Sequence, residues 1–267
     1  MKIFNGKKEA EKILAQLKQK IGKNARPKLA VIGVKPDLAS QLYIRNKKKA
    51  AKQIGIKVAY YELKNESDVI KKIQQLNANP SVHGIIVQLP LPKNFNVDRV
   101  IGFIDPSKDV DGFQQNSPLS PVLPTAILIA LKKANRKIKK ATALVNSKTL
   151  GETIKNFLTK EGIRVNYLLS ESIAQLPPVD VLITVCGCPG IIKGDMIKEG
   201  AILIDAGISM VGGKILGDVG RESVAKKAAF LTPVPGGIGP LTVALLLKNV
   251  YSAYGNSKNH RPYKPSR

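Results

Sequence analysis

Cysteine and histidine are scarce in this sequence of 267 residues, and their scarcity narrows the possible chemistry. The only cysteines, Cys186 and Cys188, are too close together for an ordinary structural disulfide. His83 and His260 are the only histidines, so the residue types that build zinc sites and Ser-His-Asp triads are nearly absent. We therefore expect no metal site and no histidine-based catalytic triad.

Long hydrophobic runs are also missing. No apolar stretch approaches the ~20 residues of a membrane-spanning helix, and the opening MKIFNGKKEAEK has charges where a signal peptide has its apolar core. Hydrophobic residues make up 43% of the chain, and its 22 glycines and 17 prolines follow no repeat, which excludes disordered and collagen-like chains. We expect a cytoplasmic globular protein of one large or two small domains.

Acidic residues are also few. The chain has 19 aspartates and glutamates and 43 lysines and arginines, which gives a formal net charge of +24. Such a balance often indicates a polyanionic partner such as nucleic acid. Here the lysines are spread through every segment. The dense runs at 45–49 and 132–140 contain no aromatic residue, and the run after Tyr254 contains only Tyr263, whereas single-strand binding uses several. A basic surface that attracts small anions is the favoured interpretation, and nucleic acid is the weaker alternative.

Hydrophobic periodicity predicts alternating helices and strands in the first part of the chain. An amphipathic helix covers the apolar positions between Ala10 and Ile21. We then expect strands at 27–34, 57–63 and 84–89, separated by helices near 40–54 and 67–76. This alternation is typical of βαβ units with a parallel sheet. Prolines crowd the segment from Pro90 to Pro124, and we place a domain boundary at 119/120.

A second alternating series follows. We expect strands at 141–146, 164–169, 179–185 and 201–207, and helices near 125–140, 150–161, 195–199 and 239–254. A strand, a glycine-containing turn, a helix and a strand in this order indicate a Rossmann-type dinucleotide-binding domain. The predicted fold class is α/β, with domains at 1–119 and 120–238. The apolar helix 239–254 is expected to complete the first domain and leave 255–267 as a loose basic tail.

Tyr43 and Lys47 are four residues apart on a predicted helix, so their side chains share one face. An aromatic ring beside an amine suits the binding of a flat heterocycle coupled to proton transfer. The neighbouring cations of the 45–49 run would favour a neutral amine, as a general base requires. The competing interpretation is that the whole run faces solvent.

Two further polar positions follow buried elements. Gln88 ends the strand in GIIVQLPLP, at the edge where parallel sheets bind ligands, although it could also mark a simple turn. In KDVDGF, Asp111 could accept hydrogen bonds from an amino-pyrimidine, whereas an Asp-x-Asp-Gly sequence is otherwise a common turn. In PVPGGIGPLTVA, Gly236, Gly237 and Gly239 precede a helix and could bring backbone N–H groups to a ligand.

These four segments together resemble one family, the bifunctional methylenetetrahydrofolate dehydrogenase/cyclohydrolases. ASQLYIRNKKKAAKQIGI is similar to the family's Ser-x-x-Tyr-Val-x-x-Lys helix, GIIVQLPLP to its Val-Gln-Leu-Pro-Leu-Pro strand end, and DPSKDVDGF to its Lys-Asp-Val-Asp-Gly-Phe loop. GAILIDAGI, LGDV and TPVPGGIGPLTVALLLKN resemble its C-terminal signatures. The resemblance covers nearly the whole chain.

The resemblance implies a two-step reaction on one folate: NADP-dependent oxidation of methylenetetrahydrofolate to methenyltetrahydrofolate, then hydrolysis to 10-formyltetrahydrofolate. It implies Lys47, Gln88 and Asp111 as catalytic residues, with Lys47 transferring protons and Gln88 tuning it. Tyr43 would stack on the pterin and Asp111 would hold its amino edge. Pro235, Gly236 and Gly237 would line the folate and nicotinamide cleft between the domains. A homodimer formed through the nucleotide domain is also implied.

The cofactor half departs from the family pattern. The phosphate turn, usually Gly-Arg-Ser-x-x-Val-Gly-x-Pro, here runs from Val145 to Thr153 without its first glycine, arginine or proline. Losing the arginine removes a bidentate phosphate partner, and Val145 is expected to obstruct close approach of the pyrophosphate. The cofactor-binding residues implied by the resemblance are Ser147, Lys148, Gly151, Ser170, Gly187 and Ile208.

The altered turn does not decide which dinucleotide the protein prefers. We expect NADP, with NAD possible, weak NADP binding and little discrimination between the two. Three interpretations remain: a bifunctional enzyme, the same fold acting mainly as a cyclohydrolase, and a basic RNA-binding protein on this scaffold. The charge itself has no explanation in the resemblance.

Overall fold

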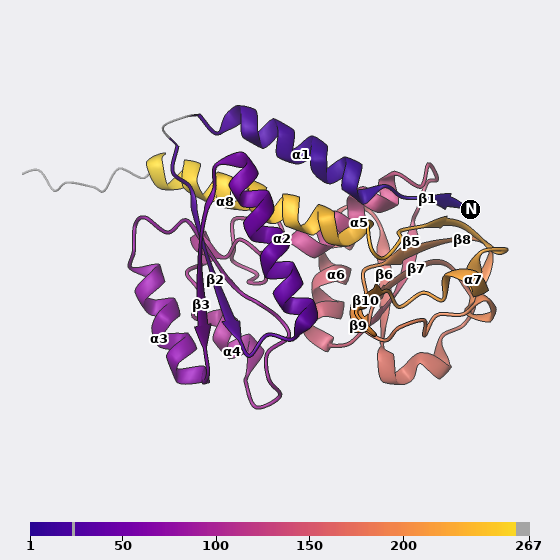
Figure 1. The fold of residues 1–267 in the computed structure, drawn as a ribbon. Helices are drawn as coiled ribbons and strands as arrows, with labels where there is room; N and C mark the ends of the chain where they lie inside the picture. Colours follow the sequence, from indigo (N-terminus) through magenta and orange to yellow (C-terminus); the bar gives the residue numbers. More distant parts are fainter. Residues whose placement is uncertain (23–24, 260–267) are drawn as a thin grey trace, which may run out of the picture. The chain divides into compact units, whose positions relative to one another are not determined.

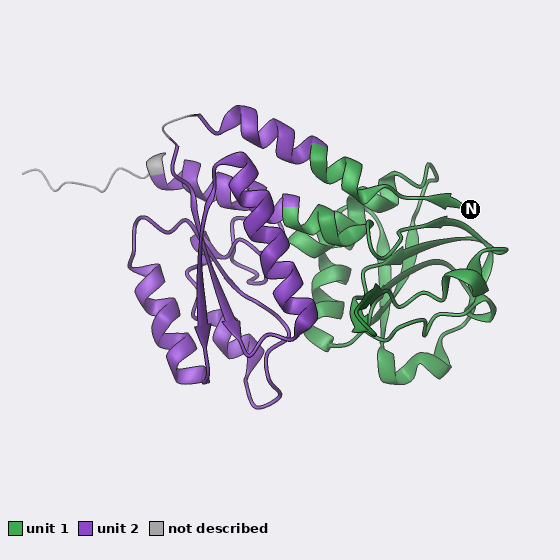
Figure 2. Ribbon diagram, viewed as in Figure 1, with its two compact units in different colours: residues 1–11, 122–243 green, residues 12–121, 244–267 purple. Residues whose placement is uncertain are grey.

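A computed structural model describes residues 1–22 and 25–259 (Figure 1). The chain divides into two compact units (Figure 2): unit 1 comprises residues 1–11 and 122–243, and unit 2 comprises 12–121 and the segment from 244 onward. We expected residues 1–119 to form one domain. The first eleven residues instead group with unit 1, because strand β1 (Lys2–Ile3) pairs in parallel with strand β11 (Ala228–Leu231).

Unit 2 is built on a parallel sheet in the order β3–β2–β4. Its strands are β2 (Lys28–Val34), β3 (Lys57–Leu63) and β4 (Gly84–Val87). Its helices include α2 (Leu38–Ile54), α3 (Glu66–Asn77), α4 (Val97–Gly102) and the 3₁₀ turn η1 (Pro106–Lys108), together with most of α1 (Gly6–Lys20) and of α8 (Ile238–Asn259). The predicted strands and helices of this part all form, and β4 ends before Gln88, which leaves that side chain just beyond the sheet.

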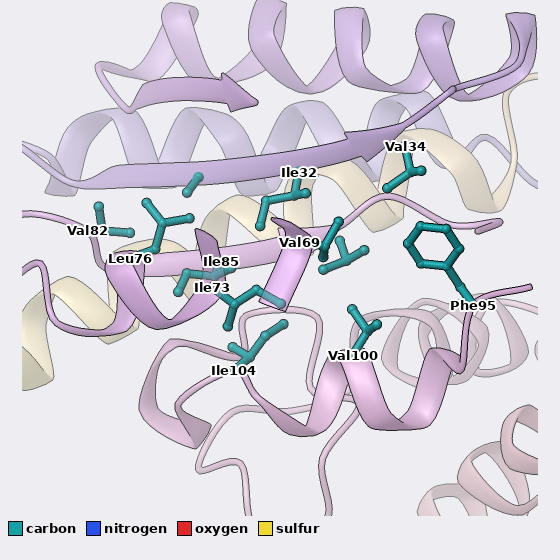
Figure 3. Packing of buried hydrophobic residues seen from close by; sticks show 12 residues of the cluster. Ile32, Val34, Val69, Ile73, Leu76, Val82, Ile85, Phe95, Val100 and Ile104 are labelled. Atoms are coloured by element: carbon teal, nitrogen blue, oxygen red, sulfur yellow. The ribbon is translucent and has the colours of Figure 1, made fainter. Parts of the chain in front are cut away.

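The core of unit 2 fixes where the ends of its strands lie. Figure 3 shows Val69, Ile73 and Leu76 of α3 packed with Ile32 of β2 and Ile85 of β4. All of these side chains are buried, and burial of each stabilises the unit by ~1.5–3 kcal/mol relative to exposure. The sheet is therefore a rigid base for the residues that follow its strands.

Helix α2 is closed at both ends by its own sequence. Asp37 caps the N-terminus, because its side chain accepts a hydrogen bond of 2.8 Å from the backbone N–H of Ser40. Gly55 ends the helix in the left-handed region, with φ of 84°, a conformation that glycine adopts without steric cost. These caps fix the register in which the helix presents its side chains.

Unit 1 contains a parallel sheet in the order β1–β11–β8–β7–β5–β6. Its remaining strands are β5 (Lys140–Val145), β6 (Arg164–Leu169), β7 (Val179–Val185) and β8 (Ile197–Asp205), with a hairpin of β9 (Ser209–Val211) and β10 (Lys214–Leu216). Its other elements are α5 (Val122–Lys132), α6 (Lys148–Lys160), α7 (Arg221–Val224), and the 3₁₀ turns η2 (Ser170–Gln175) and η3 (Gly194–Met196).

The strand order of unit 1 changes direction at β5, whose neighbours are β6 on one side and β7 on the other. The chain runs from β5 through α6 to β6 and then returns past β5 to β7. Open parallel sheets bind ligands at the carboxyl ends of the strands where the order reverses in this way. The turn from β5 to α6 lies at that point.

Three predicted segments have a different secondary structure or different bounds in the structure. The helix expected at 195–199 is wrong, because Ile197 is buried and begins β8, pairing with Val179. The helix expected at 125–140 is α5, which starts and ends earlier, and the positive φ of Asn135 falls in the connection to β5. Helix α8 continues to Asn259, so residues 255–259 are helical rather than a loose tail, while 260–267 lie outside the described residues. No helix in the described ranges is long and apolar enough to cross a bilayer.

Candidate active site

Lys47 of α2 meets Gln88 directly beyond β4. The Lys47 Nζ donates a hydrogen bond of 2.9 Å to Gln88 Oε1. Gln88 Nε2 donates a bond of 2.8 Å to the carbonyl of Leu89, which orients the amide with its oxygen toward the amine. A neutral acceptor holds the amine without favouring its charged form as strongly as a carboxylate would. The two residues predicted from separate motifs are thus brought together.

The environment of Lys47 differs from that of its basic neighbours. Arg45, Lys48 and Lys49 are exposed, and the Lys48 amine lies 4.5 Å from the centre of the Tyr60 ring, whereas Lys47 is half-buried. Burial lowers the pKa of Lys47, and the negative charge of Asp111 partly opposes this effect. We expected the neighbouring cations to lower this pKa. The structure gives burial as the cause instead, and the neighbouring cations are exposed.

Asp111 is the third member of the group. Burial raises the pKa of Asp111, and the charge of Lys47 lowers it again, so the two groups interact electrostatically. They form no ion pair within 4 Å, and the Lys47 amine is hydrogen-bonded to Gln88 instead. The carboxylate of Asp111 therefore keeps its hydrogen-bonding capacity for another partner.

The other charged residues of KDVDGF shape the loop. Lys108 Nζ donates to three carbonyls at the end of α3, those of Leu76, Asn77 and Asn79, at 2.6 to 3.0 Å. Asp109 is buried and accepts from the backbone N–H groups of Gly112 at 3.1 Å and Gln114 at 2.8 Å. Burial raises the pKa of Asp109 to about 6. Within the motif, Lys108 and Asp109 build the turn.

Tyr43 lies one helical turn before Lys47 on α2 and is half-buried. Burial raises the pKa of its phenol to about 12, so the ring is neutral at physiological pH. Its position on the same helix face as Lys47 agrees with the spacing argument. The stacking role that we expect for Tyr43 remains a prediction.

In unit 1, the turn between β5 and α6 has the chemistry of an anion site. Ser147 caps α6, its hydroxyl accepting from the N–H of Leu150 at 3.4 Å, and Lys148 is the first helical residue. Exposed N–H groups and a cation at a helix N-terminus attract phosphate. The expected obstruction by Val145 is wrong, because Val145 is fully buried at the end of β5 and its side chain packs in the core.

Gly151 has a packing role that its sequence position alone does not reveal. A Cβ at Gly151 would lie 2.5 Å from the ring of Tyr167 on β6, so α6 packs against the strand too closely for any side chain at this position. The Tyr167 hydroxyl donates to Glu152 Oε1 at 2.9 Å and fixes the ring. Close packing of the first helix on the sheet is one of the functions of glycine in dinucleotide-binding turns.

The remaining predicted cofactor residues lie in segments that follow neighbouring strands. Ser170 begins η2 directly after β6. Gly187 follows β7 with φ of 71°, and its carbonyl accepts from the Ser209 hydroxyl at 2.8 Å. Ile208 lies between β8 and β9. Their contacts with a cofactor remain predictions.

Sequence reasoning missed a carboxylate network that holds these segments. Asp218 accepts from the Thr184 hydroxyl at 2.7 Å and from the N–H groups of Cys186 and Cys188 at 2.7 and 2.8 Å. Asp205 accepts from the N–H of Asp218 itself at 3.1 Å, and burial raises the pKa of Asp205 to about 7. The available signal was an aspartate at the end of a buried strand in AILIDAG and another in LGDV.

Pro235, Gly236 and Gly237 form the turn before α8. The carbonyl of Gly236 accepts from the N–H of Lys7 at 3.2 Å, and Gly237 donates to the carbonyl of Pro233 at 2.8 Å. A Cβ on Gly237 would lie 2.6 Å from that same carbonyl. Close backbone packing within unit 1 thus requires glycine at 237, whereas Gly236 has open space around it and a φ of 105°, a conformation that favours glycine. The contact with folate that we expect for this turn remains a prediction.

Comparisons with known proteins agree with this arrangement. Residues 4–111 match the catalytic domain, and residues 121–258 the NAD(P)-binding domain, of tetrahydrofolate dehydrogenase/cyclohydrolase. The bifunctional protein FolD of Moorella thermoacetica is 39% identical over 273 residues, covering 94% of this chain and 98% of the relative.

Solved structures give the same result. The bifunctional FolD enzyme from Campylobacter jejuni superposes with a TM-score of 0.84 at 34% identity, covering 96% of this chain and 99% of that one. The Trypanosoma brucei enzyme, complexed with NADP and an inhibitor, has a TM-score of 0.86 at 28% identity, covering 96% and 98%. The chain therefore belongs to the tetrahydrofolate dehydrogenase/cyclohydrolase family, enzymes of folate one-carbon metabolism that oxidise methylenetetrahydrofolate and hydrolyse methenyltetrahydrofolate.

Proposed function

We propose that the chain carries out both family reactions on one folate and that Lys47 is the group that transfers protons. The observation that carries this proposal is the hydrogen bond of 2.9 Å between Lys47 Nζ and Gln88 Oε1, in a basic run whose other members are exposed. A lysine with a lowered pKa has a larger neutral fraction near neutral pH, as a general base requires.

Hydrolysis of the methenyl cation needs such a base. The oxygen of water bonds to the methenyl carbon while one of its protons passes to the Nζ of Lys47. Ring opening then breaks a C–N bond: the new hydroxyl becomes a carbonyl and loses its proton, and the departing nitrogen gains one. One proton is released overall. Gln88 keeps the amine in place for both transfers through its bond to Nζ.

Binding of the folate is assigned to Asp111 and Tyr43. The Asp111 carboxylate accepts hydrogen bonds from the amino-pyrimidine edge, and the charge of Lys47 favours its ionised form. Tyr43, neutral and on the same helix as Lys47, offers a flat apolar surface for the pterin. Pro235, Gly236 and Gly237 are assigned to the same substrate on the resemblance alone.

The dehydrogenase step draws on unit 1. When bound there, NADP supplies a hydride acceptor for the methylene carbon. The residues of the β5–α6 turn fit the phosphates of a dinucleotide, since Ser147, Lys148 and the N-terminus of a 13-residue helix lie at the point where the strand order reverses. Gly151, Ser170, Gly187 and Ile208 complete the proposed cofactor site. Loss of Lys47 should not stop the transfer of hydride from methylenetetrahydrofolate, because the product, methenyltetrahydrofolate, is already a cation and no proton has to be removed.

We also propose that the protein acts in the cytoplasm as a homodimer through unit 1, with a folate and a dinucleotide as its small-molecule ligands. The support is family membership. Sedimentation equilibrium would test the dimer, and a monomer at micromolar concentration would contradict it.

Spectrophotometric assays test the two activities separately. Methylenetetrahydrofolate oxidation is followed with NADP and with NAD in parallel, and methenyltetrahydrofolate hydrolysis is followed without any dinucleotide. The second candidate function, a cyclohydrolase with impaired dinucleotide use, is favoured by Asn146, which replaces the arginine of the family's phosphate turn. Intact hydrolysis with negligible oxidation by either dinucleotide would select this alternative.

A further inference from the structure

A carboxylate follows β6 at the place where Rossmann-type sheets read the adenosine ribose. In this topology β5, α6 and β6 form the first βαβ unit of the dinucleotide fold. An acidic residue about 20 residues beyond the glycine turn hydrogen-bonds the ribose 2′-hydroxyl of NAD, whereas an arginine nearby accommodates the 2′-phosphate of NADP. Glu171 follows Gly151 by 20 residues.

The sheet register places the two relevant segments next to each other. Val145 and Leu169, which end β5 and β6, are paired in the parallel ladder. Asn146 and Ser170 therefore leave the sheet at the same edge, and Glu171 comes one residue later in the first turn of η2. Residues at this edge belong to the βα turns that surround a bound dinucleotide.

The charge of Glu171 is not neutralised by the protein. Its side chain is exposed, and it has neither an ion pair nor a hydrogen bond within the part of the chain that the structure describes. Asn146 is also exposed and carries no charge. Lys148 is the only cation in the segments 146–151 and 170–172, and it begins α6, the helix end that attracts the pyrophosphate.

A 2′-phosphate adds roughly two negative charges to the ligand. Opposite Glu171 these charges are repelled, whereas a 2′-hydroxyl can donate a charge-assisted hydrogen bond to the same carboxylate. We propose that Glu171 makes the ribose subsite of unit 1 select NAD over NADP, and that the uncharged Asn146 supplies no cation for a 2′-phosphate. This selectivity replaces the weak discrimination that we expect from the loss of the arginine alone.

The overall charge of +24 acts in the opposite direction, because it attracts the more anionic NADP. Charges farther away than about 8 Å are largely screened at physiological ionic strength. The nearest groups therefore decide the preference, and the distant lysines raise the association of both dinucleotides.

The inference rests on the proposed function, since it assumes that unit 1 binds a dinucleotide. It is tested by isothermal titration of the full chain with NAD and with NADP, without folate, so that binding is measured independently of turnover. The variant Glu171→Gln removes the charge with little change in shape. Glu199→Gln is the matched control, because Glu199 is an exposed acid of the same unit near the amino end of β8, the opposite edge of the sheet.

We expect the unaltered protein to bind NAD ~10-fold or more tightly than NADP, and Glu171→Gln to reduce that ratio ~10-fold. Glu199→Gln should leave the ratio unchanged. Tighter binding of NADP by the unaltered protein, or an equal effect of both variants, would overturn the selectivity while leaving the dehydrogenase proposal in place. Failure to bind either dinucleotide would overturn both.

Discussion

The site in unit 2 and the turn in unit 1 represent two ways in which a sequence specifies a ligand site. Around Lys47 the site is defined by side chains: the Lys47 amine donates a hydrogen bond to Gln88 and interacts electrostatically with Asp111. At the β5–α6 turn the site is defined mostly by the backbone, at the N-terminus of a helix that Ser147 caps and where Gly151 packs on Tyr167. Side chains at the turn can therefore change while an anion site remains.

The largest effect is expected at Lys47. Lys47→Met should lower methenyltetrahydrofolate hydrolysis by at least ~10²-fold, the contribution of a general base, and change folate affinity only a few-fold. Lys48→Met is the control, because the Lys48 amine lies over the Tyr60 ring on the surface. Steady-state hydrolysis rates decide the matter, and equal damage from the control would contradict the assignment.

Asp111→Ala comes next. We expect folate affinity to fall by ~1.5–3 kcal/mol, because the donors of the amino-pyrimidine lose a charged hydrogen-bond partner. Calorimetry with a folate analogue measures this loss. Unchanged affinity would make Asp111 a turn-forming residue like Asp109, whose buried carboxylate already accepts two backbone hydrogen bonds.

In unit 1 a backbone position should matter for stability. Gly151→Ala places a methyl group against the Tyr167 ring, and overpacking of this kind costs ~1–3 kcal/mol, partly offset by the ~1 kcal/mol gained in helix propensity. Urea unfolding measures the difference. Gly255→Ala is the matched control, since Gly255 is helical with open space around it, and it should be neutral or stabilising. A destabilised control would invalidate the comparison.

A side chain at the turn should matter for affinity instead. Asn146→Arg returns a bidentate phosphate partner and should tighten NADP binding ~10-fold without affecting hydrolysis at Lys47. Titration with NADP provides the measurement. Val145→Gly is not a useful companion change, because Val145 is buried and its loss would leave a cavity. If Asn146→Arg had no effect, the backbone of the turn would have to follow a path unlike that of the family.

The smallest effect concerns pH. The charge of Asp111 raises the pKa of Lys47 against the larger lowering by burial. Asp111→Asn removes this charge, so the pKa of Lys47 falls further and the neutral amine persists to lower pH. The acidic limb of the kcat profile for hydrolysis should therefore move to lower pH. A shift to higher pH would mean that another group controls that limb.

Periodicity predicted the helix that carries Lys47 and the buried strand that precedes Gln88. The pairing of the two residues was implied by the resemblance to the family, and the structure shows it as a hydrogen bond of 2.9 Å. The spacing could not show that Lys47 is half-buried while Lys48 is exposed, since burial depends on what packs against the helix. The sequence also could not show which residues of KDVDGF build the loop and which remain available for a ligand. Lys108 belongs to the first group because it binds carbonyls at the end of α3, about 30 residues away. The helix expected at 195–199 was wrong because Ile197 pairs with Val179 of the neighbouring strand, a long-range contact that the local sequence does not show.

The hydrogen bonds of Asp218 bear on how this protein can vary. The carboxylate holds Cys186 and Cys188 through their backbone N–H groups, which any residue except proline supplies. Different side chains at Cys188, which is only half-buried, are therefore compatible with the same loop. Tolerance to substitution is therefore unequal across this contact: the side chain at Cys188 can vary, whereas the aspartate that holds the loop, about 30 positions further along the chain, cannot.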